Sequence, residues 1–137
     1  MATLVDTNVL IDVAVRDPVW SKWSLSKMVS ALGQGSLVIN QIIYAEFSMR
    51  YEAIDDVDDA LPEDEFRRES LPFEATFAAS RAFSVYRRLG GPREKVMPDF
   101  LIGAHAAIRG YPILTRDPAG FRKYFPDVEL ITPDTHP

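Results

Sequence analysis

Acidic residues stand where two predicted strands of this 137-residue chain end. Asp6 directly follows the predicted strand TLV, residues 3–5, and Asp117 closely follows the predicted strand PILT, residues 112–115. Ligands in open α/β sheets sit outside the carboxyl ends of the strands, so we expect both carboxylates to project at that edge. Acids gathered at such an edge can hold a cation and bring it to a phosphate.

Two further acids are placed by helical patterns. Asp99 lies in the first turn of a predicted helix over 97–110, where the helix dipole alone would favour a negative charge. Glu46 shares an apolar stripe of the predicted helix 41–54, so a charge stands at a position typical of a core residue. An ion pair with Arg50, one turn later, is the structural alternative for Glu46.

Together the four acids point to a metal site. Clustered carboxylates repel one another, and an unpaired buried carboxylate either raises its pKa or finds a cation. The chain has no cysteine, and the predicted donors are oxygen atoms, which favours Mg²⁺ or Mn²⁺ over zinc. An ion held in this way is suited to phosphodiester hydrolysis.

Strand and helix patterns alternate along the chain, which favours an α/β fold with a mainly parallel sheet covered on both faces. The strand patterns occupy residues 3–5, 36–40, 111–117 and 128–131. The helical patterns, bounded by proline, glycine or capping residues, occupy 7–15, 18–33, 41–54, 70–91, 97–110 and 118–125.

Size and composition predict one globular domain over residues 1–137, because 47% of the residues are hydrophobic and 26% are charged. No apolar run approaches the roughly 20 residues that span a bilayer, and the first residues lack the pattern of a signal peptide. We therefore expect a cytoplasmic protein with no membrane contact. The absence of cysteine excludes disulfides, thiolate metal sites and cysteine nucleophiles.

A net charge of −5 would ordinarily disfavour a nucleic acid partner. However, seven acids are concentrated in the segment 55–65, and the remainder of the chain is basic once the four site acids are set aside. We interpret this segment as a solvated linker or as the start of a helix after Pro62, where acids match the dipole. A polyanionic partner remains compatible with the sequence.

His105 lies in the predicted helix 97–110 and shares a polar strip with Arg109, four residues later. This strip is turned to one side of Asp99. We therefore expect His105 to be a surface residue, and we assign it no role as a base or as a metal ligand.

Four motifs resemble, in order and spacing, those of PIN-domain nucleases, in particular the VapC toxins of bacterial and archaeal toxin–antitoxin pairs. They are LVDTNVLID, INQIIYAEF, PDFLIGAHA and ILTRD, and the set extends across residues 3–117. The resemblance implies a compact three-layer α/β/α domain with Mg²⁺- or Mn²⁺-dependent endoribonuclease activity. It also implies a homodimer that is inhibited by a cognate antitoxin.

The resemblance also implies roles for individual residues. The residues that match the metal-binding acids of the family are Asp6, Glu46, Asp99 and Asp117. The first and third of these are expected to hold the principal ion, and the other two to act through water or at a second ion. The polar residues that match those supporting the acids are Thr7, Asn8 and Thr115.

Three basic residues flank the later acids in sequence: Arg93, Lys95 and Arg116. They are candidates for contacts with RNA phosphates beside the metal. Simple solubility is an equally good explanation of their charge. The RNA that is cut has no local signature in the sequence.

Two alternatives remain open. A phosphatase with Asp6 as nucleophile would need a second acid two residues later, and that position is Asn8. A PIN-like module that binds RNA or protein without cleaving would usually lack one or more of the acids, and all four are present.

Overall fold

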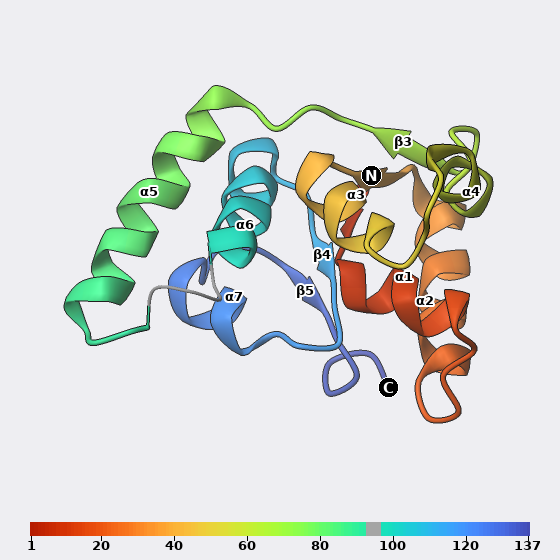
Figure 1. The fold of residues 1–137 in the computed structure, drawn as a ribbon. Helices are drawn as coiled ribbons and strands as arrows, with labels where there is room; N and C mark the ends of the chain where they lie inside the picture. The colour runs from red at the N-terminus through yellow and green to blue at the C-terminus, as the bar shows by residue number, and fades with distance from the viewer. Residues whose placement is uncertain (93–96) are drawn as a thin grey trace.

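The computed structural model describes residues 1–92 and 97–137 (Figure 1). Its centre is a five-stranded sheet in the order β3-β2-β1-β4-β5, and every neighbouring pair is parallel. The strands are β1 (Thr3–Val5), β2 (Leu37–Ile39), β3 (Phe66–Arg68), β4 (Ile113–Leu114) and β5 (Leu130–Ile131). The predicted parallel sheet is therefore confirmed.

Helices cover the sheet on both sides. They are α1 (Thr7–Ala14), α2 (Ser21–Gln34), α3 (Gln41–Ser48), α4 (Ile54–Ala60), α5 (Phe73–Arg88), α6 (Met97–Arg109) and α7 (Ala119–Tyr124). Figure 1 shows α1 to α4 on one side of the molecule and α5 to α7 on the other. This separation follows from right-handed crossovers, since the chain runs from β1 outward to β3 and then returns to β4 and β5. The predicted three-layer α/β/α architecture is confirmed.

The order of the strands reverses between β1 and β4. Leu4 of β1 pairs with Val38 of β2 on one side and with Ile113 of β4 on the other, so β1 lies between the two halves of the sheet. The carboxyl ends of β1 and β4 are therefore adjacent at a topological switch point, the usual location of a ligand site in such sheets.

The acidic segment 55–65 differs from its interpretation as a linker or a helix start after Pro62. Helix α4 contains its first acids, and the residues after Pro62 turn directly into β3. Two apolar residues within the segment, Val57 and Leu61, are buried in the core and anchor it. Strand β3 was not predicted, because three residues with two exposed arginines carry too little apolar alternation to be recognised.

The prediction that His105 lies on the surface is wrong. Its side chain is fully buried, and its two ring nitrogens contact Asn40 and Glu69 at 2.9 and 2.6 Å. Asn40 also caps α3 by accepting a hydrogen bond from Ile43 N–H, so its amide nitrogen donates to Nδ1 of His105 and Nε2–H donates to Glu69. Glu69 directly follows the unpredicted strand β3, so no local pattern indicates this partner.

We predict that His105→Leu lowers the free energy of unfolding by about 2–3 kcal/mol, because it leaves the buried amide of Asn40 without its acceptor. Urea unfolding measures the change. The matched control is His136→Leu, which alters an exposed histidine and should change stability by less than about 0.5 kcal/mol. Equal effects of the two substitutions would contradict a structural role for the buried network.

Within the described residues, no helix is both long enough and apolar enough to span a membrane.

Candidate metal centre

The four predicted acids line one pocket of about 260 Å³ at the switch point. Asp6 follows β1 and caps α1, whereas Glu46 lies on α3. Asp99 is in the first turn of α6, and Asp117 follows β4. The remaining residues of this acidic pocket are Thr7, Asn8, Ile11 and Met49. Segments more than 100 residues apart in sequence thus contribute carboxylates to one space.

Asp6 is the buried member, with 6% of its surface exposed. Its carboxylate accepts hydrogen bonds from Thr7 N–H at 2.8 Å, from the Thr115 hydroxyl at 2.8 Å and from the Asn8 amide at 3.3 Å. Burial nevertheless raises the pKa of Asp6 to about 7, and the charges of Asp99 and Glu46 add to this effect. Hydrogen bonds from Thr115 and Thr7 oppose the rise. Asp6 therefore ionises at a substantial energetic cost.

Asp99 is more accessible, and its pKa is also raised, to about 6. Partial loss of hydration is the main cause, and the charges of Glu46 and Asp117 follow. The helix dipole therefore does not offset the crowding of like charges at this position. All four acids are linked by these repulsions, which supports treating them as one electrostatic unit.

The three polar residues that accompany the acids each contact at least one of them. The Thr7 hydroxyl donates to Glu46 at 2.7 Å, so Glu46 is held from α1. The Thr115 hydroxyl donates to Asp6 and accepts from Asp117 N–H at 3.0 Å. These contacts place Thr7 and Thr115 where they orient carboxylates.

Asn8 and Arg50 are the other two residues for which the sequence predicts a contact with an acid. Asn8 reaches Asp6 and the Thr115 hydroxyl through its amide nitrogen, both at 3.3 Å. Among the described residues, the ion pairs do not include the alternative pairing of Glu46 with Arg50. Glu46 instead faces the acidic pocket.

Arg116 is engaged with the protein. Its guanidinium forms a two-point ion pair with Asp12, with Nε at 2.6 Å and Nη2 at 2.8 Å from the two carboxylate oxygens, and it lies 5.4 Å from the ring centre of Trp20. Its backbone N–H donates to Asn8 at 3.2 Å. Arg116 thus fixes the corner that carries Asp117, whereas the sequence suggested a phosphate contact. The other two basic candidates, Arg93 and Lys95, lie outside the described residues.

Sequence reasoning did not identify Asp12, which is 1% exposed and also accepts a hydrogen bond from the Ser24 hydroxyl at 2.8 Å. One signal was available. A single acid within the apolar run 9–15 of a helix needs a partner if that face is buried.

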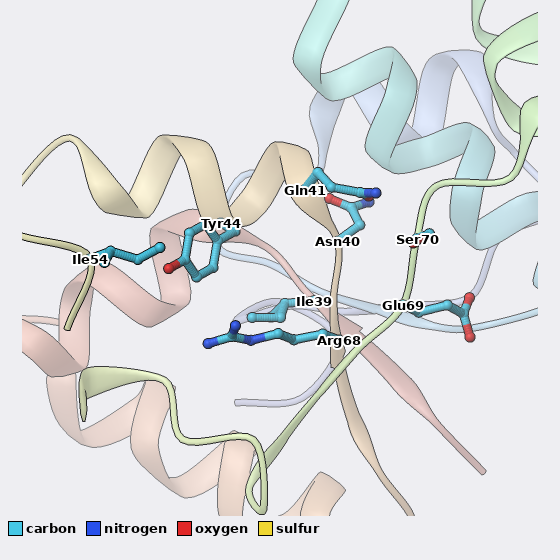
Figure 2. A pocket seen from close by; sticks show the side chains of 8 residues that line it. All are labelled: Ile39, Asn40, Gln41, Tyr44, Ile54, Arg68, Glu69 and Ser70. Carbon is cyan, nitrogen blue, oxygen red and sulfur yellow. The ribbon is translucent and has the colours of Figure 1, made fainter. Parts of the chain in front are cut away.

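A larger pocket, of about 300 Å³, lies at the carboxyl ends of β2 and β3 (Figure 2). Arg68 lies 5.0 Å from the ring centre of Tyr44, and both side chains bond to Asp58. Glu69 points away from these two side chains and is bonded to His105. This second pocket therefore lacks the gathered carboxylates of the acidic pocket.

The donor chemistry of the acidic pocket fits a hard divalent ion, because it offers carboxylate and hydroxyl oxygens. The spacing is not yet that of a coordination shell: within the described residues, no group of three or more His, Cys, Asp or Glu side chains has the geometry of a metal site. Hydrogen bonds from Thr7 and Thr115 hold oxygens of Glu46 and Asp6. These side chains would have to turn in order to coordinate one ion.

A family model described as "PIN domain" matches residues 3–125. The chain belongs to the PIN-domain family. No curated protein sequence matches this PIN domain.

Solved structures share the fold. VapBC2 from Rickettsia felis, bound to a DNA fragment from its promoter, aligns with a TM-score of 0.75 and 15% identity over 96% of this chain and 98% of that chain. VapBC-1 from nontypeable Haemophilus influenzae aligns with a TM-score of 0.72 and 16% identity, again over 96% of this chain and 98% of that chain. FitAcB from Neisseria gonorrhoeae aligns with a TM-score of 0.70 and 21% identity over 100% of both chains. At these identities the alignments establish a common fold.

We predict that Asp99→Asn stabilises this PIN domain by about 1 kcal/mol in EDTA at pH 8, after allowance for solvent screening. The sign follows from the raised pKa: a carboxyl that binds its proton more tightly when folded loses stability as the pH rises through its folded pKa. The gain should therefore be small at pH 4 and complete above pH 7. Urea unfolding across this range measures it.

The control for this variant is Asp127→Asn, which removes an exposed carboxylate outside the acidic pocket. It should leave the unfolding curve nearly unchanged at every pH. If Asp99→Asn is instead less stable than the wild type at pH 8, the favourable helix dipole outweighs repulsion and the acids are not a repulsive cluster.

We predict that Arg116→Met lowers the free energy of unfolding by about 3 kcal/mol, because it leaves buried Asp12 without its cation. Adding Asp12→Asn should recover part of the loss, as in a double-mutant cycle. Arg50→Met, at an exposed position, is the control. A loss no larger than that of the control would show that the ion pair does not secure this corner.

Proposed function

We propose that this PIN domain is a Mg²⁺- or Mn²⁺-dependent endoribonuclease that acts as the toxin of a toxin–antitoxin pair. The observation that supports this function most strongly is the meeting of four carboxylates in one pocket, two of them with raised pKa values. Membership of the PIN-domain family adds independent support. We further propose that residues 1–137 form one domain that works in the cytoplasm.

The acids have different positions, which suggests different roles. Asp6 lines the pocket just after the end of β1, and Asp99 lines it from the first turn of α6. We assign these two acids the principal ion. Glu46 and Asp117 act through water or at a second ion. An ion bound there supplies a Lewis acid for hydrolysis of an RNA phosphodiester.

The polar residues of the site keep the acids oriented. Thr7 holds Glu46, whereas Asn8 and Thr115 hold Asp6. These hydrogen bonds keep the carboxylates beside the acidic pocket, which limits the freedom that they lose when they turn to coordinate. Charge is the second contribution of the chain, since ionised carboxylates attract a cation to the mouth of the pocket.

The partners proposed are an RNA substrate, a second copy of the chain in a homodimer, and a cognate antitoxin. The antitoxin partner is supported by solved structures that share this fold. A structure described as a toxin–antitoxin complex from Klebsiella pneumoniae aligns with a TM-score of 0.60 and 21% identity, over 96% of this chain and 97% of that chain.

A non-cleaving PIN-like module that binds RNA or protein is the second candidate. One observation favours it: the carboxylates of the described residues do not already have the geometry of a metal site. A phosphatase is less well supported, because Asn8 occupies the position of its general acid and donates to Asp6.

The deciding experiment is incubation of the purified protein with total RNA and with single-stranded oligonucleotides at pH 8. We predict cleavage in Mg²⁺ or Mn²⁺ and none in EDTA. Asp99→Asn should lower the rate by roughly 100-fold or more, because even the outer partners of a metal site typically contribute 10- to 100-fold. Asp127→Asn should cleave like the wild type, and thermal melting confirms that both variants are folded.

Three other outcomes would contradict the proposal in different ways. RNA binding without cleavage would favour the non-cleaving module. Release of inorganic phosphate from a small ester would favour a phosphatase. Cleavage that persists in EDTA or in the folded Asp99→Asn variant would separate the activity from the acidic pocket.

A further inference from the structure

An aromatic hollow of about 70 Å³ adjoins the acidic pocket. It lies where the end of α5, the start of α6 and α7 meet, and α6 packs against both of the others (Figure 1). Asp99 lines both the hollow and the acidic pocket, so the two spaces are neighbours on either side of this residue. The other residues of the hollow are Tyr86, Phe100, Gly120, Phe121, Tyr124 and Phe125.

The rings around the hollow hold one another in place. Phe100 is 4% exposed and lies with its ring centre 5.5 Å from that of Tyr86 and 5.1 Å from that of Tyr124. The two tyrosine rings are 5.8 Å apart and nearly perpendicular, at 76°. Both tyrosines are only half-buried, so the hollow presents aromatic surface at its rim. Such edge-to-face clusters are favourable and rigid.

The charge around the hollow suits a nucleotide. The Lys123 ammonium lies 5.4 Å from the ring centre of Tyr124, so a cation stands on the rim. Asp99 also lines the hollow, and it belongs to the acidic pocket where the proposed ion and a phosphate meet. A ligand that spans both spaces therefore carries a phosphate at one end and a flat apolar group at the other.

We propose that the aromatic hollow receives one base of the RNA, next to the phosphate held at the acidic pocket. This inference depends on the proposed function, because it requires RNA at the four acids. The hollow admits one edge of a ring while the face of the base lies against a tyrosine. Aromatic stacking of this kind accepts any base. The hollow therefore determines the position of the cut in the RNA, and it does not select among the bases.

Gly120 offers a way to close the hollow. Gly120 lines the hollow, and a Cβ atom added to it would meet nothing within 4 Å, so a larger side chain can begin there without a clash. Gly33 provides a matched control, since it is also an exposed glycine within a helix with nothing within 4 Å of an added Cβ. Replacing either glycine by leucine improves helix propensity and so should not unfold the protein.

The first experiment compares wild type, Gly120→Leu and Gly33→Leu on an oligonucleotide that the wild type cuts. Abasic sites are placed singly on either side of the cut. We expect one abasic site to lower kcat/KM about tenfold for the wild type and Gly33→Leu. Gly120→Leu should already be about tenfold slower on intact RNA, and that abasic site should cost it nothing more.

The second experiment measures base stacking by fluorescence during binding, before the RNA is cleaved. Oligonucleotides carry 2-aminopurine at single successive positions, and fluorescence is recorded in the binding phase of a stopped-flow trace. We expect quenching at one position with the wild type and Gly33→Leu, and its loss with Gly120→Leu. Quenching in a protein that never cuts RNA would keep the base site and overturn the proposed nuclease.

Two results would overturn the base site and leave the nuclease intact. One is a wild-type enzyme that cuts RNA with no abasic position affecting its rate. The other is a Gly120→Leu variant that cuts and quenches like Gly33→Leu. If Gly120→Leu instead loses only its binding to a protein partner, the hollow receives an apolar side chain of that partner and not a base.

Discussion

Repulsion between carboxylates at the carboxyl ends of β1 and β4 is the constraint on which the site depends. Asp6 is buried there beside the charges of Asp99 and Glu46, and its pKa rises to about 7 although three groups donate hydrogen bonds to it. A fold that tolerates such crowding does so at some expense of stability. Binding of a divalent cation would relieve it, because the cation favours the charged form of every acid in the acidic pocket.

Uncharged and paired groups keep the acids in place. Thr115 links Asp6 to the backbone of Asp117, and the ion pair between Arg116 and Asp12 ties the same corner to α1. The parallel sheet brings this corner next to Asp6, since β1 and β4 are neighbours. Topology therefore brings the four carboxylates together, and hydrogen bonds hold those of Asp6 and Glu46 in place.

The gathering of the four acids in one pocket could be predicted from the sequence, because each acid has a local sign. Asp6 and Asp117 follow apolar strands, and Glu46 interrupts an apolar stripe. His105 and Arg116 were misjudged because their partners are remote: Glu69 follows a strand of three residues, and Asp12 is 104 residues from Arg116. Charge alone cannot distinguish a basic residue free to meet RNA from one already paired in the fold.

The most direct test of this account is the anomalous diffraction of crystals grown with Mn²⁺. We predict a peak between Asp6 and Asp99, with Glu46 and Asp117 turned toward it and with the Thr7 contact of Glu46 exchanged for the ion or its water. A map in which the four side chains are ordered but no ion lies among them would contradict the central claim that these carboxylates form a metal site.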